Sequence, residues 1–470
     1  MKHFLKRLAG FSLGSFVGAL ISVVQIPIMT RLMTSANYGI FTFFKNIVTQ
    51  IPPFLCLGFD QAYVREYHTD HRKVHVFQQA VIVPFLVSAF LFLLSILFRH
   101  RLSQWFFGRP EDGYLVILGG LWCLMGVLER FIFLVVRMAE RALDYSKIGI
   151  GIKAMVFVAT VTILLSGNRE YSGAVLGMTL GWLAADIYLL YRFRSFLDFR
   201  LFEKDRVLFG RMVRYGLPLV IGIALGAVLN TLDNLFLRSF ASAEELGIYN
   251  AAAAIVNLFA LVTNAFMNFW VPTALRWYEE DRAVKHYAFI SDALLLVLTG
   301  IFFFLLLFSP LVPKVLGEGY QNVDLILGLL SIRHIMRILS EISCLGIMFQ
   351  RKSEYNMIIS LMIFLSSLLV NFFLTPRLGF RGAAIANAVS FIVFYLSRTF
   401  FSRKCGFRIP QKKQIITVFL LFGTGIYYAL NLPGRLPVLI IAFALELLVQ
   451  SSTFTTMLEI FRGEGEWNFD

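Results

Sequence analysis

The sequence predicts an all-α integral membrane protein with about fourteen transmembrane helices. Hydrophobic residues make up 58% of the 470 residues and charged residues only 15%, whereas soluble proteins are about a quarter charged. Uncharged windows such as Val74–Phe98 and Ile415–Gly434 are long enough to cross a hydrocarbon core about 30 Å thick. A third observation, a repeat of the first half of the chain in the second half, sorts these helices into groups.

The apolar windows, read in order, place fourteen spanning helices. Their approximate limits are residues 8–30, 40–58, 76–98, 114–136, 147–167, 171–191, 215–237, 248–274, 289–310, 322–346, 355–375, 382–400, 415–431 and 436–457. The first six pair with the next six, and the last two have no counterpart. We therefore predict a six-helix bundle over 1–200, a second over 201–410, and two extra helices with a cytoplasmic tail over 411–470.

The repeat has an offset of about 209 residues and keeps one register over much of the chain. Matched segments include Arg141, Asp144 and Tyr145 with Arg351, Glu354 and Tyr355, and residues 171–174 with residues 380–383. Because each repeat holds six helices, an even number, both repeats have the same orientation in the membrane. A parallel repeat of this kind predicts a substrate path between the two halves.

The distribution of basic residues predicts the orientation. Most of the 43 Lys and Arg residues fall in segments that are cytoplasmic if the N-terminus is inside, above all in residues 192–214 and 398–413. Both termini are then cytoplasmic. The same bias, together with anionic lipid headgroups as partners, accounts for most of the net charge of +14. Nucleic acid need not be invoked as a partner.

Motifs for catalysis and for cofactor binding are missing from the sequence. It holds no GxxxxGK[ST] phosphate-binding loop. Its four cysteines, Cys56, Cys123, Cys344 and Cys405, have no spacing typical of a metal site. We therefore expect a protein that is not an enzyme and that needs neither a cofactor nor a metal.

Charged side chains inside the predicted helices are the candidate functional residues, since each costs at least about 2.5–3.5 kcal/mol at mid-membrane. Arg333, Arg337 and Glu341 have i, i+4, i+8 spacing and therefore share one face of the helix 322–346. The remaining ones are Lys45, Glu129, Arg130, Lys153, Asp186 and Asp233. Structural ion pairs, Arg337 with Glu341 or Glu129 with Arg130, are an alternative, and Lys153 is expected to extend to the membrane surface. Five cations against four anions favour an anionic cargo.

Three loose motifs carry a resemblance to a family. The run Gly222–Ala252, with Asp233, Arg238 and Tyr249, resembles the seventh helix and following loop of polysaccharide export proteins. Residues 28–32 and 36–39 are similar to their first helix and loop, and residues 376–384 to the stretch before their twelfth helix. With its helices arranged as six, six and two, the whole chain resembles lipid-linked oligosaccharide flippases of the multidrug/oligosaccharidyl-lipid/polysaccharide exporter superfamily.

The resemblance implies a flippase that moves undecaprenyl-diphosphate-linked oligosaccharide repeat units across the bacterial inner membrane by alternating access. Membrane lipids and a polysaccharide polymerase are candidate partners, and the last two helices would form a groove for the lipid tail. The sugar unit stays open among O-antigen, capsule, exopolysaccharide and similar units. The resemblance also implies a cavity lined by basic residues, to which we assign Lys45, Arg130, Arg333 and Arg337, with Arg31 at its outer rim. The candidates for coupling to a proton or sodium gradient are Asp233, Glu341 and Asp186.

Two other functions fit the same scaffold. A cation-coupled multidrug or metabolite antiporter would need an acidic residue in the cavity of the first half. The helix 8–30 has no Asp or Glu, and the helix 40–58 has only Asp60 just past its end, which counts against an antiporter. A membrane scaffold that recruits polysaccharide enzymes would leave the embedded Arg and Lys without a purpose.

Overall fold

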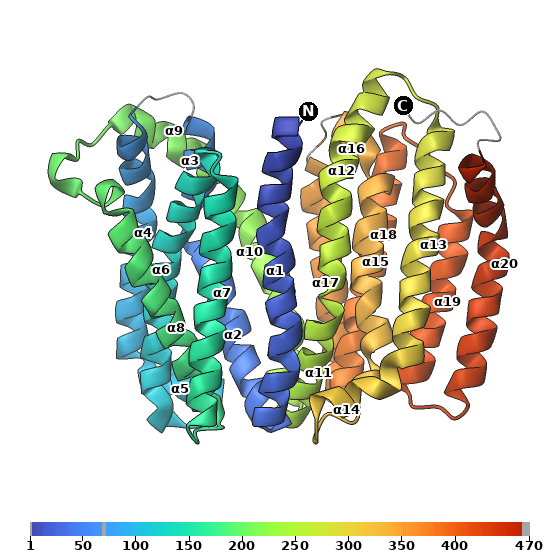
Figure 1. Cartoon of the computed structure of the whole chain (residues 1–470), viewed down its shortest axis with the longest axis horizontal. Coiled ribbons are helices and arrows are strands. Elements are labelled where there is room, and N and C mark those ends of the chain that lie inside the picture. The colour runs from blue at the N-terminus through green and yellow to red at the C-terminus, as the bar shows by residue number, and fades with distance from the viewer. Residues whose placement is uncertain (1, 68–71, 351, 353, 463–470) are drawn as a thin grey trace. The chain divides into compact units, whose positions relative to one another are not determined.

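The computed structural model describes residues 2–67, 72–350, 352 and 354–462 (Figure 1). Every regular element within these residues is a helix, which confirms the predicted all-α class. The α-helices are α1 (Lys2–Leu32), α2 (Ser35–Leu55), α3 (Phe59–Glu66), α4 (Lys73–Leu97), α5 (Arg99–Phe107), α6 (Gly113–Met138), α7 (Ala142–Leu165), α8 (Tyr171–Arg192), α9 (Arg206–Gly216), α10 (Leu219–Phe240), α11 (Ala243–Val256), α12 (Phe259–Glu279), α13 (Val284–Phe308), α14 (Val312–Leu316), α15 (Leu327–Ser343), α16 (Leu345–Phe349), α17 (Glu354–Leu378), α18 (Phe380–Lys404), α19 (Lys412–Ala429) and α20 (Arg435–Phe461).

The chain separates into two compact units, Met1–Thr231 and Leu232–Asp470. The boundary falls inside α10, which begins at Leu219 and ends at Phe240. The three regions predicted from the sequence, 1–200, 201–410 and 411–470, stay a prediction. From α2 in the first unit and from α11 in the second, the order of elements is a divided helix, a long helix, a short helix and three long helices, of which the last two pack together; the second unit adds the short α16 between α15 and α17.

The first unit is held together by close helix pairs. In it α7 packs along both α1 and α8, and α4 packs along α6. The α7–α8 pair depends on small residues, because a Cβ atom at Gly177 would lie 2.5 Å from the Cα atom of Thr160. One turn on, a Cβ atom at Gly181 would lie 2.6 Å from the Cα atom of Val156. Glycines four residues apart therefore let the two backbones touch, as is common between membrane helices.

A bend of 49° separates α2 from α3. Pro52 and Pro53 weaken the helix ladder just before it, and Leu57 and Gly58 then have positive φ angles of 49° and 76°. The amphipathic helix α9 packs against α3. A Cβ atom at Gly58 would lie 2.2 Å from the carbonyl oxygen of Gly216, so the backbones of α9 and of the bend are in contact. The helix predicted over 215–237 begins at Leu219 in the structure, because Pro218 separates α9 from α10.

The second unit contains α15 as its most enclosed helix. It packs against α18, α13 and α19, while α17 lies along α18 and α19 lies along α20. The window 248–274, predicted as one helix, is divided into α11 and α12 at Asn257 and Leu258. The α11 helix starts with a reciprocal capping box, in which Ser242 and Glu245 satisfy each other's backbone N–H groups.

Eight helical segments of the described chain are long and apolar enough to cross a membrane, and the bent pair α2 and α3 makes a ninth. The eight are Lys73–Leu97, Pro110–Met138, Ala142–Leu165, Tyr171–Arg192, Val284–Leu316, Glu354–Leu378, Phe380–Lys404 and Arg435–Ile460. Many of their outward side chains are large and apolar, such as Leu97 at 72% exposed and Leu448 at 71%. A multi-pass membrane protein follows. The count of fourteen spans stays a prediction, although every predicted window is mostly helical.

Candidate functional site

The predicted charged stripe on α15 is the accessible face of that helix. Every residue from Leu327 to Ser343 is buried except Arg333, Arg337 and Glu341. The i, i+4, i+8 spacing thus leaves one row of charge open on a helix that is otherwise enclosed by protein. A row of this kind can meet water or a polar ligand without breaking the packing around it.

The three side chains of the stripe have different surroundings. The Arg333 guanidinium lies 4.7 Å from the centre of the Phe391 ring on α18 and close to the charge of Asp233. Glu341 forms an ion pair of 2.8 Å with Arg398 of α18, instead of the pair with Arg337 that the sequence allowed. Arg337 is exposed and lies near the cation Arg333. Arg337 is therefore the residue of the stripe best placed to meet an anion.

Asp233 is the centre of a buried hydrogen-bond cluster in the second unit. Its carboxylate is 5% exposed and accepts hydrogen bonds from the Tyr249 hydroxyl at 2.7 Å, the Asn371 amide at 2.8 Å and the Asn387 amide at 2.6 Å. These donors come from α11, α17 and α18. The carbonyl oxygen of the Asn387 side chain is buried and accepts no hydrogen bond from the described residues. The cluster therefore joins four helices and offers oxygen atoms at its centre.

Arg130 and Asp60 form an ion pair in the first unit. The Arg130 Nη2 and Nε atoms lie 2.6 Å and 2.9 Å from the same oxygen, Oδ2, of Asp60. The Asp60 side chain is fully buried, whereas that of Arg130 is 37% exposed. The bend after α2 places Asp60 beside α6, which brings this pair together. The positive charge of Arg130 is thereby largely compensated, so it is less available to a cargo anion than the sequence predicted.

Asp186 of α8 lies beside Glu129 of α6. The Trp182 indole N–H, which is also on α8, donates a hydrogen bond to the Glu129 carboxylate. Asp186 is 4% exposed, and neither of its carboxylate oxygens accepts a hydrogen bond from the described residues. The alternative pair of Glu129 with Arg130 is not formed, since Arg130 binds Asp60. Two carboxyl groups this close in a buried setting can share a proton.

Lys45 of α2 has another cation as its charged neighbour, Lys153 of α7. The expectation that Lys153 extends to the membrane surface stays a prediction. The Lys153 ammonium nitrogen would lie 2.6 Å from a Cβ atom at Gly18, in the middle of α1. Arg31 is exposed in the last turn of α1. The first unit thus holds two neighbouring lysines on its helices α2 and α7, an arrangement that favours an anionic ligand.

The structure brings only part of the predicted set together. Lys45 belongs to one unit, and Arg333, Arg337 and Asp233 belong to the other. The four cysteines are buried and free, and no group of three or more His, Cys, Asp and Glu in the described residues could hold a metal ion. Sequence reasoning missed the partners Asp60, Asn371, Asn387 and Arg398. A search for neutral amides within the apolar windows would have found the two asparagines.

The fold defines a multi-pass membrane protein that carries charged side chains inside its helices. The sequence profile of the family described as "Polysaccharide biosynthesis protein" matches residues 4–277, more than half of the chain. The chain belongs to this family, which confirms the family predicted from the sequence. A capsular polysaccharide biosynthesis protein of Staphylococcus aureus, CapF, is 25% identical over 197 residues, 40% of this chain and 48% of CapF. The chain thus spans about half the length of this curated relative.

Solved structures share the fold over nearly the whole chain. The lipid II flippase MurJ, in an inward closed conformation, aligns with 95% of this chain and 99% of its own, with a TM-score of 0.70 and 13% identity. An inward-facing multidrug resistance transporter of the MATE family aligns with 85% of this chain and 99% of its own, with a TM-score of 0.60 and 14% identity. Both likenesses show the fold alone.

Proposed function

We propose that the protein is a flippase that moves undecaprenyl-diphosphate-linked oligosaccharide units across the bacterial inner membrane by alternating access, for surface polysaccharide synthesis. Membership in the polysaccharide biosynthesis protein family supports this activity, as does the matching region of CapF. The fold shared with MurJ is compatible with a large lipid-linked cargo. The proposed activity is transport and not catalysis.

The single observation that carries the proposal is the accessible cationic stripe on α15. Arg337 is exposed on a helix whose other residues, apart from Arg333 and Glu341, are buried. Moving a diphosphate through bare hydrocarbon is prohibitive, because an isolated charge loses its hydration there. A guanidinium replaces water well, since it binds two phosphate oxygens at once. We assign the diphosphate or acidic sugars of the cargo to Arg337 and Arg333.

Lys45 is the proposed anion-binding residue of the first unit, now together with Lys153. The two ammonium groups repel each other, and a bound anion would relieve that repulsion. Arg31 keeps its proposed place at the outer rim. Arg130 keeps a secondary role only, because Asp60 compensates its charge at 2.6 Å.

Asp233 is the proposed coupling residue for a proton or sodium gradient. A carboxylate beside the buried amide oxygen of Asn387 offers two oxygen atoms of the kind that hard cations prefer. Asp186 with Glu129 is a second candidate, suited to a proton. Glu341 is the weakest candidate, because Arg398 already binds it at 2.8 Å.

The location follows from the same proposal. A flippase of this cargo works in the bacterial inner membrane, and the positive-inside bias places both termini in the cytoplasm. Membrane lipids and a polysaccharide polymerase are the proposed partners. Which sugar unit is carried, whether O-antigen, capsule or exopolysaccharide, depends on the shape of the cargo cavity.

Transport in proteoliposomes tests the proposal. One leaflet is loaded with undecaprenyl-diphosphate oligosaccharide, and its appearance in the other leaflet is followed, with a cationic dye as control cargo. We expect Lys45→Ala and Arg337→Ala to abolish most of the transport of the lipid-linked sugar. Lys412→Ala, which changes an exposed lysine at the start of α19, is the matched control and should transport as the parent does. Dye movement without sugar-lipid movement would contradict the proposal and favour the antiporter.

A further inference from the structure

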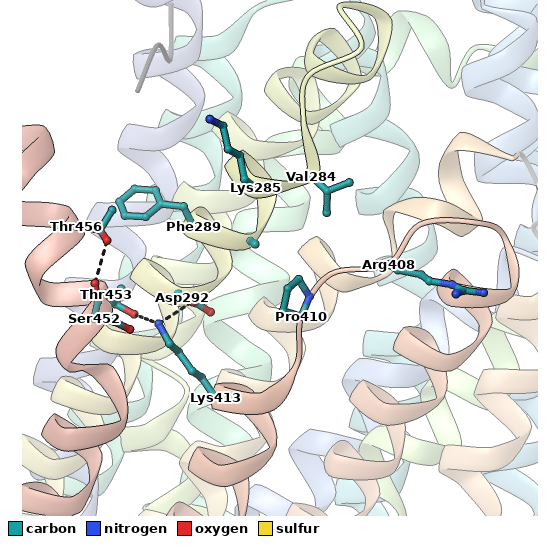
Figure 2. Close-up of a pocket in the computed structure, with 11 residues that line it drawn as sticks. Val284, Lys285, Phe289, Asp292, Arg408, Pro410, Lys413, Ser452, Thr453 and Thr456 are labelled. Carbon is teal, nitrogen blue, oxygen red and sulfur yellow. Dashed lines mark hydrogen bonds and ion pairs between the residues drawn. The ribbon is translucent and has the colours of Figure 1, made fainter. Parts of the chain in front are cut away.

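A cavity of about 490 Å³ opens in the second unit, away from the α15 stripe. It lies where α13 and α19 begin and where α20 nears its end (Figure 2). Its lining combines three cationic side chains, one carboxylate and hydroxyl groups with an apolar remainder. A volume of this size is typical of a small-molecule site, which commonly falls in the range of about 300–1,000 Å³.

The charge of the cavity is positive. Lys285, Arg408 and Lys413 line it, and Asp292 is the carboxylate among its lining residues. Lys413 forms an ion pair with Asp292, in which Nζ and Oδ2 lie 3.0 Å apart. Lys285 and Arg408 are both exposed and come from different elements, α13 and the segment before α19. The cavity thus keeps an excess of positive charge at its mouth.

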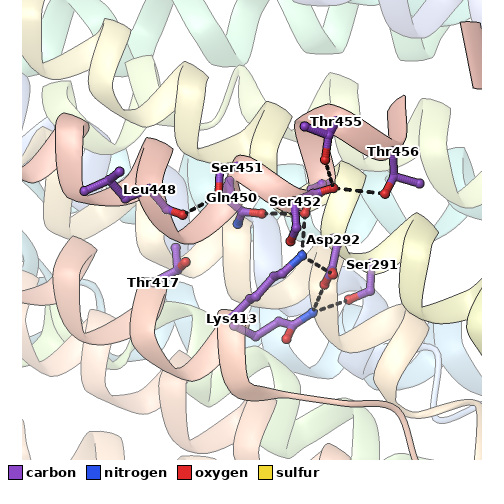
Figure 3. A network of polar contacts seen from close by, with 12 residues as sticks. Ser291, Asp292, Lys413, Thr417, Leu448, Gln450, Ser451, Ser452, Thr455 and Thr456 are labelled. Atoms are coloured by element: carbon purple, nitrogen blue, oxygen red, sulfur yellow. Dashed lines mark hydrogen bonds and ion pairs between the residues drawn. The ribbon is translucent and has the colours of Figure 1, made fainter. Parts of the chain in front are cut away.

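The floor of the cavity is fixed by a hydrogen-bond network (Figure 3). Lys413 donates to the Thr453 hydroxyl at 2.7 Å, and Thr453 donates to Gln450 at 3.0 Å. The Gln414 amide donates to the other oxygen of Asp292 at 2.7 Å. Thr453 and Gln414 are 2% and 1% exposed, so the network is inside the protein. The polar floor is therefore formed before any ligand arrives, which lowers the entropic cost of binding.

The cavity also has an amphipathic setting. Val284, Phe289 and Pro410 line it, while the Ser452 hydroxyl of α20 is exposed beside them. On α20 the exposed side chains of Ile441, Leu445 and Leu448 share the helix face of Ser452, which gives acyl chains an apolar surface that leads to the cavity. An ion without a lipid tail would leave this apolar surface unused. The site therefore suits an amphiphile whose head carries phosphate.

We propose that this cavity binds the phosphate headgroup of an anionic membrane phospholipid. Arg408 and Lys413 belong to the basic segment 398–413, which the charge distribution assigns to the cytoplasmic leaflet. Basic pockets between membrane helices on that side bind anionic headgroups. Lys285 and Arg408, which lie on opposite sides of the cavity (Figure 2), attract the charge of the headgroup, and the Ser452 hydroxyl donates a hydrogen bond to a phosphate oxygen, while the acyl chains follow α20. This lipid site is separate from the proposed cargo site and does not depend on what the cargo is.

Native mass spectrometry of the full-length protein tests the proposal. The probes are phosphatidylglycerol and phosphatidylcholine with identical acyl chains, which differ in headgroup charge. The test variant is the double change Lys285→Gln and Arg408→Gln, both at exposed positions, and the matched control is Lys412→Gln. Lys412 is exposed next to Lys413 and does not line the cavity. We expect phosphatidylglycerol retention to weaken about fivefold for each cation removed and to be unchanged in the control.

Four outcomes would overturn the lipid site. They are equal retention of both lipids, an equal loss in test and control variants, displacement by millimolar inorganic phosphate, and preference for undecaprenyl diphosphate over phosphatidylglycerol. The third would indicate a site for free phosphate and the fourth a cargo site. Thermal unfolding of each variant, run in parallel, separates lost binding from lost folding. Sugar-lipid transport is measured on the same samples, so failure of the flippase proposal is recorded independently.

Discussion

Removing the Asp233 carboxylate is the most direct test of how the second unit is held together. In Asp233→Ala, three buried donors lose an acceptor that now lies 2.6–2.8 Å away. Asn371 retains a second acceptor, the carbonyl oxygen of Ser367 at 3.0 Å. The Tyr249 hydroxyl and the Asn387 amide are affected most.

The expected loss of stability is about 2–3 kcal/mol. A buried donor left without an acceptor costs about 1–3 kcal/mol, whereas hydrogen bonds between membrane helices average about 0.6 kcal/mol and reach about 1.7. Two strongly affected donors thus give between about 1 and 6 kcal/mol. Removing the buried charge relieves its own desolvation penalty, but Arg333 then loses the attraction of the carboxylate, so these two effects oppose each other. The lower half of the range is expected because hydrogen bonds between membrane helices average near its low end.

Equilibrium unfolding in detergent, combined with double-mutant cycles, measures this loss. The cycle of Asp233→Ala with Asn387→Ala should give a coupling of about 1 kcal/mol or more. The cycle with Asn371→Ala should give less, since Asn371 keeps Ser367. Asn234→Ala is the control: Asn234 is the neighbour of Asp233 and accepts one hydrogen bond, from Asn250 at 2.8 Å. If Asp233→Ala proves no less stable than Asn234→Ala, the cluster does not hold the helices together and the reasoning fails.

Three further predictions concern the first unit. Arg130→Gln should lower stability by up to about 3–5 kcal/mol, because Asp60 is fully buried and loses its cation; adding Asp60→Asn should recover most of the loss, and no recovery would contradict the pairing. Gly58→Ala should lower the free energy of unfolding by about 1–3 kcal/mol in the same assay, because φ is +76° and the new Cβ atom would clash with the Gly216 carbonyl. Its control is Gly210→Ala on α9, where the new Cβ atom has open space, so this variant should be neutral or stabilising. The protection of residues 206–216 against hydrogen exchange, corrected for the intrinsic pH dependence of amide exchange, should be high at neutral pH and fall as the pH drops below about 4. The backbone N–H groups of Leu208 and Val207 lower the pKa of Asp205, so its stabilising contribution is lost as the pH falls through that lowered value; unchanged protection factors in Asp205→Ala at neutral pH would refute the cap.

Local patterns in the sequence predicted most of the helices and the single charged face of α15. The stripe of Arg333, Arg337 and Glu341 follows from helical periodicity and the cost of charge in lipid, and the structure leaves only these three residues of α15 accessible. The bend after α2 was foreseeable in part, since Pro52 and Pro53 precede it. The break between α11 and α12 has no such signal, because neither Asn257 nor Leu258 is a helix-breaking residue.

The partners of the candidate residues could not be predicted, because they depend on which helices pack together. Asp60 is near Arg130 only because the chain turns by 49° just before it. Asn371 and Asn387 are uncharged, so a search for embedded charge passes over them although both bind Asp233. Arg398 lies in a basic cluster that the sequence explains as a positive-inside signal, yet its guanidinium reaches Glu341. Pairing between distant segments is information that spacing does not hold.

The distribution of counter-ions within each unit supports an anionic cargo more strongly than the number of cations does. Asp60 compensates Arg130, and Glu341 compensates Arg398, so these arginines need no ligand. Lys45 lies near the cation Lys153, and Arg337 lies near the cation Arg333, which is itself close to Asp233. Cations placed together in a low-dielectric setting raise the free energy of the empty protein, and a bound phosphate lowers it again. Arg130 and Arg398, which are paired with carboxylates, therefore stabilise the fold, whereas Lys45 and Arg337 are the cations proposed to bind an anion.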